Sequence, residues 1–172
     1  KFNYFKMFSF YKRHNDKLYN SLVKLSRNIF FYKNIKLSDK FETRVVLIFF
    51  HFAIILKHYK INLRKNFPQE IYDNIFLNIE YNLRELGYGD ISVNKQMKNL
   101  NNIFYDILIK LNDDKYKQFK INNKIINKHL MSNKEVNSHI NSILCEYFNS
   151  FYHFCFELDP KSVVEGKINF KY

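Results

Sequence analysis

The stretch VVLIFFHFAIIL, residues 45–56, is the most apolar run of this 172-residue chain. It has about twelve residues and is followed by Lys57, His58 and Lys60, whereas a membrane-spanning helix needs about twenty apolar residues. A helix that is apolar on nearly every side is typical of the buried centre of a helical bundle. The run therefore predicts a central buried helix and argues against a transmembrane segment.

The sequence around this run indicates where the central helix begins and ends. Asp39 resembles an N-cap, and Glu42 three residues later completes a capping box. The helix is expected to cover about residues 42–59 and to bury Phe49, Phe52, Ile55 and Leu56. Upstream, residues 16–27 carry leucines at helical spacing, and the aromatic-rich connection 28–37 is expected to pack down on the bundle.

Two more helices are predicted to meet at a glycine-containing corner. Pro68 suits the first turn of one helix, and Gly87 suits the left-handed position that ends it. Ser92 is expected to cap the next helix, whose apolar stripe runs to Leu111. We expect Gly87 or Gly89 to adopt a positive φ.

The last third of the chain carries weaker signals. A polar helix is expected over residues 115–130. Ser132 and Glu135 form a second capping box, which opens a helix over residues 136–158. The Asp159–Pro160 pair is expected to end that helix and to leave the remainder as a tail.

These signals predict an all-α fold, namely a soluble single-domain helical bundle of five to six helices. We divide the chain into a basic aromatic N-terminal segment (1–15), a helical domain (16–131) and a C-terminal helix and tail (132–172) that packs on the same domain. Cys145 and Cys155, if both lie on one helix, are about 15 Å apart along its axis, too far to form a disulfide.

The charge of the chain has two interpretations. The net charge is +12, and nearly all of the excess comes from lysine, in a chain also rich in Asn, Ile, Phe and Tyr. This composition follows from AT-rich codons without any functional cause. It also produces an attraction to RNA or to an anionic membrane surface.

A search for catalytic chemistry finds no motif. The chain contains no HExxH, no Cys/His set with zinc spacing, no P-loop and no GxSxG. His51 is either a haem or metal ligand or a core histidine with a hydrogen bond, and the second interpretation is preferred. We therefore predict a protein that is not an enzyme and that holds no cofactor or metal.

The most specific string is NIEYNLRELGYGDISVNKQMKNLNNIFYDIL, residues 78–108. Together with LSRNIFFYKNIKLSDKFETR (25–44) and LIFFHFAIIL (47–56), it resembles the ubiquinol–cytochrome c chaperone family. The resemblance is collinear over about residues 18–130, with His51 on the family's histidine, and Lys40 departs from the usual threonine. The matching positions at the corner are Asn82, Leu83, Arg84, Glu85, Gly87, Gly89, Asp90, Ser92, Val93, Lys95, Met97, Phe104 and Tyr105.

The resemblance implies a non-enzymatic assembly factor for respiratory complex III. Members of the mitochondrial kind bind newly made cytochrome b, associate with the ribosome near the tunnel exit and act with a small partner protein. The location implied is the cytoplasmic side of a bacterial inner membrane or the mitochondrial matrix. The alternative from a different class is a basic RNA- or ribosome-binding helical protein.

Partner binding is assigned by the resemblance to Arg84, Glu85, Gly87, Gly89, Asp90 and Lys95. The same residues also suit a plain helix–turn–helix corner, and the two interpretations are compatible. We further hypothesise that aromatic residues near both termini help to form the client surface and that nearby lysines permit peripheral membrane contact. These aromatics are Phe2, Tyr4, Phe5, Phe8 and Phe10 at the start, and Phe151, Tyr152, Phe154 and Phe156 near the end.

Overall fold

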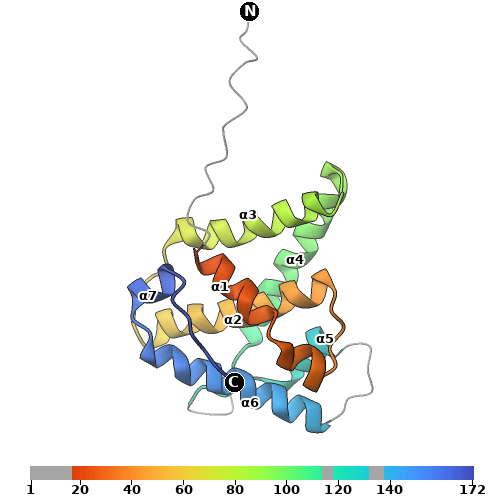
Figure 1. The fold of residues 1–172 in the computed structure, drawn as a ribbon. Helices are drawn as coiled ribbons and strands as arrows, with labels where there is room; N and C mark the ends of the chain where they lie inside the picture. The colour runs from red at the N-terminus through yellow and green to blue at the C-terminus, as the bar shows by residue number, and fades with distance from the viewer. Residues whose placement is uncertain (1–16, 114–117, 132–137) are drawn as a thin grey trace, which may run out of the picture.

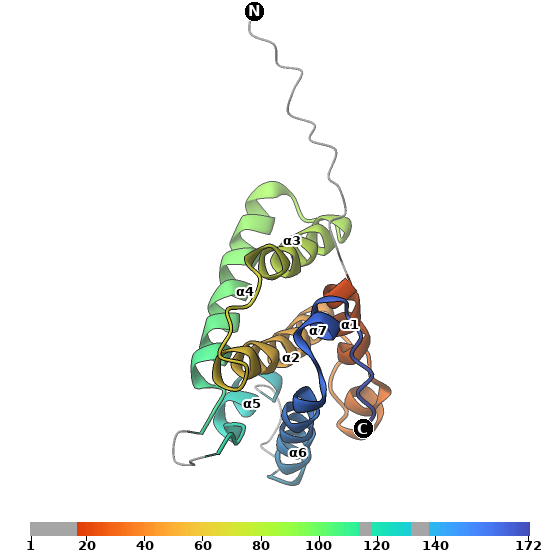
Figure 2. The same ribbon diagram turned by 90° about the vertical axis from the view of Figure 1, so that its left-hand side faces the viewer.

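Helix α2 (Phe41–Ile61) crosses the middle of the molecule in the computed structural model, which describes residues 17–113, 118–131 and 138–172 (Figure 1). Helices α1, α4 and α6 pack against it from different sides (Figures 1 and 2). The other elements are α1 (Lys17–Ser26), the π-helical turn η1 (Phe30–Asn34), α3 (Gln69–Glu85), α4 (Asp90–Lys110), α5 (Asn123–Leu130), α6 (Ser138–Phe154), the 3₁₀ turn η2 (Cys155–Glu157) and α7 (Pro160–Val164).

The predicted all-α single-domain bundle is confirmed. Within the described ranges there are seven α-helices, of which α5 and α7 have only eight and five residues, and the only strand-like pairing is one isolated bridge between Asn112 and Ile121. Of the helices in these ranges, none combines the length and the apolar character that crossing a bilayer requires.

Burial of α2 on all sides explains its composition. Phe49 and Phe52 are fully buried and Ile55 is 1% exposed, as predicted. Leu56 is only partly buried, so that prediction was wrong. Periodicity could not show this, because burial at each position of α2 depends on the neighbouring helices that pack on it.

The predicted capping box of α2 does not form. Lys40 occupies the N-cap position and makes no side-chain cap hydrogen bond. Asp39 instead accepts a hydrogen bond from Arg44 Nε at 2.7 Å, which lowers the pKa of Asp39. The carboxylate thus lies one residue too early to cap the helix and is held by an arginine one turn inside it.

Helix α3 begins one residue later than predicted, whereas α4 begins earlier. Pro68 is the residue before the first turn of α3 rather than part of that turn. The residue before α4 is Gly89, and Ser92 lies inside the first turn. Ser92 is therefore not the N-cap, because the helix has already started at Asp90 when the chain reaches it.

The predicted helix over residues 115–130 is much shorter. Of its described residues, only those of α5 are helical, and Asn122 caps α5 by accepting a hydrogen bond from Lys124 N at 3.0 Å. The preceding chain, where it is described, pairs back on the end of α4 through the Asn112–Ile121 bridge. A strong side-chain cap in the middle of the predicted helix explains why the helix begins there.

A cluster of charges joins α4 to α5. Asp106 lies between Lys110 of its own helix and both Lys128 Nζ, at 2.6 Å, and His129 Nε2, at 2.8 Å. Burial alone would raise the pKa of Asp106, but the hydrogen bonds from these three side chains outweigh it and hold the pKa below the usual range. The acid in this apolar stretch therefore fastens one helix to the next.

The C-terminal region is more ordered than a tail. Asp159 caps the short helix α7 by accepting a hydrogen bond from Ser162 N at 3.0 Å. The chain then returns along α1, where Gly166 has a φ of +66° and lies so close to Lys17 O that a Cβ atom would be 2.2 Å from it. The capping box predicted at Ser132 and Glu135 lies outside the described residues.

Candidate partner-binding site

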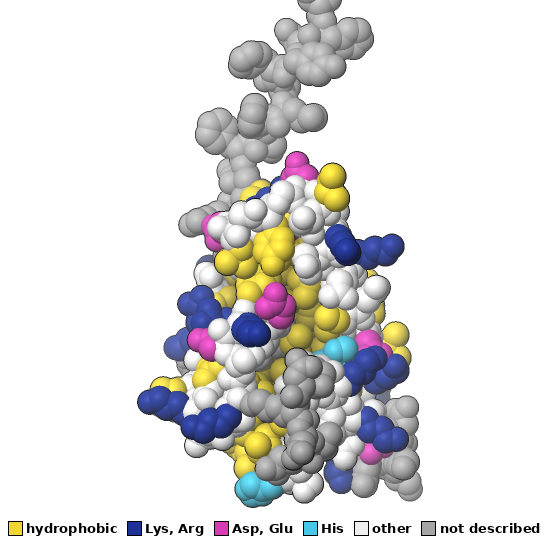
Figure 3. Space-filling view, turned by 90° about the vertical axis from the view of Figure 1, so that its right-hand side faces the viewer, with side chains coloured by type: hydrophobic (Ala, Val, Ile, Leu, Met, Phe, Trp, Pro, Cys, Tyr) yellow, Lys and Arg dark blue, Asp and Glu magenta, His cyan; other side chains and the backbone are white. Residues whose placement is uncertain are grey.

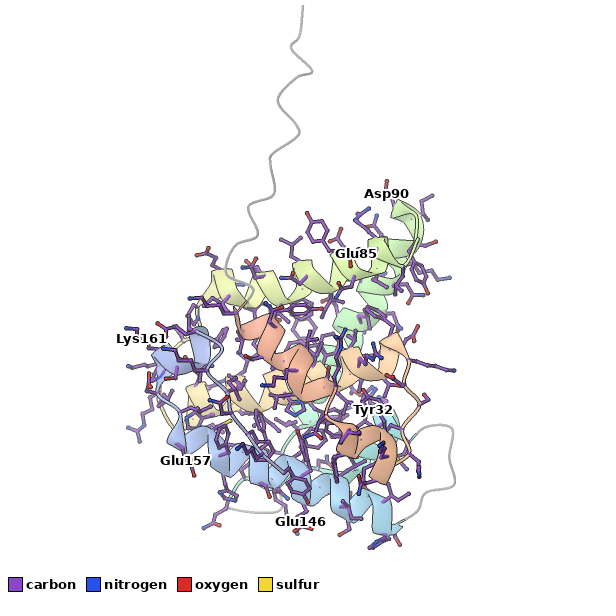
Figure 4. The ribbon with its side chains drawn as sticks, viewed as in Figure 1. Tyr32, Glu85, Asp90, Glu146, Glu157 and Lys161 are labelled. Carbon is purple, nitrogen blue, oxygen red and sulfur yellow. The ribbon has the colours of Figure 1, made fainter. Side chains whose placement is uncertain are left out.

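The corner between α3 and α4 contains all the residues that the sequence assigned to partner binding, apart from Lys95. Arg84 in the last turn of α3 donates from Nη2 to Glu80 Oε1 at 2.8 Å and from Nη1 to Asp90 Oδ1. The Glu80 pair lies within α3, and the Asp90 pair bridges the end of α3 and the start of α4. Figure 4 labels Glu85 and Asp90 at this corner, far from the α6 and α7 side of the molecule.

The two glycines of the corner have different backbone roles. Gly87 has a φ of +90°, and Tyr88 N donates to Leu83 O at 3.2 Å, which is the hydrogen-bond pattern of a left-handed helix end. The prediction of a positive φ is therefore confirmed at Gly87. Gly89 is in an extended conformation with a φ of −73° and precedes α4 as its N-cap residue.

Exposed apolar side chains surround the corner, and the sequence motif did not single them out. Leu86 is 57% exposed, Tyr88 36% and Ile91 87%. The sequence could have indicated this exposure, because large apolar residues here stand among glycines and charged residues in a short connection that is not expected to be buried. Such a cluster on the surface is characteristic of interaction sites.

Beside the corner, a groove of about 240 Å³ opens where α1, α2 and α3 diverge. Val45 and Ile48, both almost fully buried, belong to its apolar lining, with partly buried Phe41 and exposed Leu86. Figure 3, which views the right-hand side of Figure 1, shows a band of hydrophobic side chains down this face. The volume is below the roughly 300–1,000 Å³ typical of small-molecule pockets, which favours an inserted side chain over a cofactor.

Charges of both signs lie on the rim of the groove. Glu85 comes from α3, whereas Arg27 and Arg44 come from the opposite side. Arg44 is paired with Asp39, but the side chains of Arg27 and Glu85 make no hydrogen bond or ion pair with any residue that the structure describes. An apolar lining with unpaired charges at its edge suits an amphipathic segment of another protein.

The structure thus separates the six residues assigned from sequence. Glu85 lines the groove, Arg84 and Asp90 brace the corner, and the two glycines shape its backbone. Lys95 is exposed on α4 and does not line the groove. The groove residues contributed by α1 and α2 were not identified from sequence, because they come together only through helix packing.

His51 is a core histidine, as preferred. It is completely buried, its Nδ1 donates to Leu47 O at 2.7 Å, and its Nε2 accepts from the Tyr147 hydroxyl at 2.9 Å. Burial lowers its pKa to about 4, so the ring is neutral at pH 7. Both ring nitrogens are occupied by protein partners, and neither is available to a haem iron or a metal ion. The described residues contain no group of His, Cys, Asp and Glu side chains arranged to hold a metal.

Most of the C-terminal aromatics are not part of an exposed surface. Phe151 is fully buried and Tyr152 is 5% exposed, whereas Phe156 is 54% exposed. Phe151 packs edge-on against Phe170 with ring centroids 5.3 Å apart, so the returning chain covers it. The hypothesis that these residues help to form the client surface was therefore wrong for Phe151 and Tyr152. Residues 1–15 lie outside the described residues.

Comparison with known proteins agrees with the sequence motif. The family model described as "Ubiquinol-cytochrome C chaperone" matches residues 33–150, or 118 of the 172 residues. The match continues into α6, past the region where resemblance was recognised from the sequence. No curated protein and no solved structure matches the chain. The chain belongs to the ubiquinol-cytochrome C chaperone family.

Proposed function

We propose that this protein is a non-enzymatic assembly chaperone for ubiquinol–cytochrome c reductase and that it binds newly made cytochrome b. The family match supports the assembly role. The choice of client rests on one observation, the open apolar groove between α1, α2 and α3 beside the exposed apolar corner. The site of action would be the cytoplasmic side of a bacterial inner membrane or the mitochondrial matrix.

The physical argument concerns the client before it is fully assembled. Cytochrome b is a bundle of apolar membrane helices, and any part of them that remains in water exposes apolar surface. An apolar groove can take up side chains from one face of such a helix, and charges at the rim keep the empty groove hydrated. Arg27 and Glu85 can form ion pairs with oppositely charged residues of cytochrome b in the loops that flank the bound segment.

The test replaces an exposed residue of the groove, so that the fold is not disturbed. Leu86→Asp places a charge on the rim, and Ile61→Asp is the matched control because Ile61 is 53% exposed at the far end of α2. Each variant is used to pull down cytochrome b from detergent-solubilised membranes of cells that make complex III. We expect capture by the wild type and by Ile61→Asp and its loss with Leu86→Asp. Equal capture by both variants would remove the groove from the proposal.

The net charge of +12 favours a second candidate, binding to RNA or to the ribosome. Affinity that depends on phosphate contacts falls steeply with added salt, whereas capture of apolar segments does not. A salt titration of the pull-down, with ribosomal RNA and cytochrome b measured in the same samples, separates the two. A small partner protein would also be recovered in this experiment.

A further inference from the structure

Helix α4 carries a line of exposed residues along its outermost edge. The residues are Ile91, Lys95, Lys98, Asn102, Tyr105 and Ile109, spaced alternately by four and three positions, so they lie on one side of the helix. Ile91 is 87% exposed, Tyr105 52% and Ile109 74%. Two isoleucines this exposed on a single helix have no role in the core of the bundle.

The opposite side of α4 makes its contacts with the rest of the fold. Val93, Leu100, Phe104 and Ile107 are buried there, and α4 packs on α2, α3 and α5. Figure 2 shows α4 at the left edge of the molecule, with its outer side turned away from those three helices. The exposed line is therefore a helix face without a partner in the part of the chain that the structure describes.

The middle of this face is positively charged. The side chains of Lys95 and Lys98 make no ion pair or hydrogen bond with any described residue. The acids of α4 are already neutralised, since Asp90 is paired with Arg84 and Asp106 with Lys110, Lys128 and His129. The face thus combines two free lysines with a large apolar side chain at one end and two at the other.

We infer that this face of α4 docks on an anionic lipid bilayer surface. Lysines attract acidic headgroups, and isoleucine and tyrosine side chains enter the interfacial region beside them. Phosphates of RNA would attract the same lysines but would leave both isoleucines in water. A protein partner fits less well, because the buried centres of protein interfaces are depleted in lysine.

The geometry allows the helix to lie flat on the bilayer. From Ile91 to Ile109 the helix rises about 27 Å, so its two apolar ends and central lysines contact one plane together. None of the six residues lines the groove between α1, α2 and α3. Lipid docking therefore uses residues outside the groove and shares only Ile91 with the exposed apolar corner, so the lysine variant described below and Leu86→Asp test the two proposals separately.

The experiment is flotation of the full-length protein with vesicles of phosphatidylcholine alone or mixed with phosphatidylglycerol. We expect binding to the mixed vesicles only. Lys95→Glu with Lys98→Glu is expected to weaken it at least about tenfold, since each lysine near an anionic surface contributes about fivefold. Ile91→Ser with Ile109→Ser is expected to weaken it as well, because the apolar anchors are removed.

Matched controls lie outside α4, at the end of α2 and in the connection that follows it. Lys60→Glu with Lys65→Glu makes the same change in net charge, and Ile61→Ser removes another exposed isoleucine. These variants are expected to bind like the wild type, and circular dichroism of all variants checks that the fold is kept. Equal loss in the control charge variant would reduce the effect to net charge and overturn the inference. A loss confined to the lysine variant, with ribosomal RNA binding lost in parallel, would instead assign the face to RNA.

Discussion

The interior around α2 and the corner between α3 and α4 use polar residues in opposite ways. His51 and Tyr147 are fully buried and hydrogen-bonded to each other, among Phe31, Phe148 and Phe151. Arg84 and Asp90 are paired at the surface, where both side chains are exposed. The buried pair contributes strongly to stability because its polar atoms have no water to replace a lost partner, whereas the exposed pair does not. The side chains of the corner can therefore rearrange to bind a partner with little loss of stability.

The largest expected effect separates two adjacent aromatics of α4. Phe104 is fully buried and packs on Phe49, Phe52 and Phe76, whereas Tyr105 is 52% exposed. Phe104→Ala is expected to lower the free energy of unfolding by about 3–5 kcal/mol, because it leaves a cavity in the core. Tyr105→Ala is expected to cost about 1 kcal/mol or less. Urea denaturation measures both.

If Phe104→Ala does not fold, Phe104→Leu gives the same comparison with a smaller cavity. Similar costs at positions 104 and 105 would contradict the division into core and exposed faces on which the surface assignments depend.

The second effect is a loss of stability in acid, and it comes from the interior. Burial lowers the pKa of His51 from 6.5 to about 4, so the unfolded chain binds a proton between these pH values that the folded chain does not. Stability therefore falls as the pH is lowered through this window, by about 3 kcal/mol in total at roughly 1.4 kcal/mol per pH unit. The buried ring of His58 adds a change in the same direction.

Denaturant unfolding measured from pH 7.5 down to pH 4 tests this expectation. His51→Gln keeps a polar side chain opposite Tyr147 but cannot titrate, so its stability should vary less with pH than that of the wild type. A variant with the same pH dependence as the wild type would show that His51 is not responsible.

The third effect compares the two glycines of the corner. Gly87 has a φ of +90°, which a β-branched residue adopts only with strain, so Gly87→Val is expected to cost about 1–2 kcal/mol. Gly89 has open space around its Cβ position and an ordinary φ. Gly89→Ser is expected to be neutral or slightly stabilising, since serine is a better N-cap than glycine. Thermal unfolding of both variants checks this, and an unchanged melting temperature for Gly87→Val would contradict it.

The smallest effect concerns the ion pairs of the corner. Arg84→Gln removes both the Glu80 and the Asp90 pair, yet the melting temperature is expected to stay close to that of the wild type because the pairs are exposed. Arg84→Lys is the control that keeps the charge. A marked drop in melting temperature with Arg84→Gln alone would mean that these exposed pairs contribute to stability, against this expectation.

Local patterns in the sequence determined most of the helices. The residues around His51 are apolar at consecutive positions, so apolar side chains lie on every side of the helix. Such a helix must be covered by others all round, which predicts the central position of α2. Gly87 was identified as a left-handed helix end because only glycine adopts that conformation without strain. The family motif at the corner was likewise readable, since its residues are contiguous in the chain.

Only the tertiary structure decided which of these residues remain exposed. The exposure of Leu56 depends on the helices that pack on α2, including α6, which is distant in sequence. The burial of Phe151 depends on the returning C-terminal chain, where Phe170 covers it. The groove joins Val23 of α1, Val45 of α2 and Leu86 just after α3, which no local pattern links. Periodicity predicts that a helix has an apolar face, but the number of neighbouring helices determines how much of that face is left for a partner.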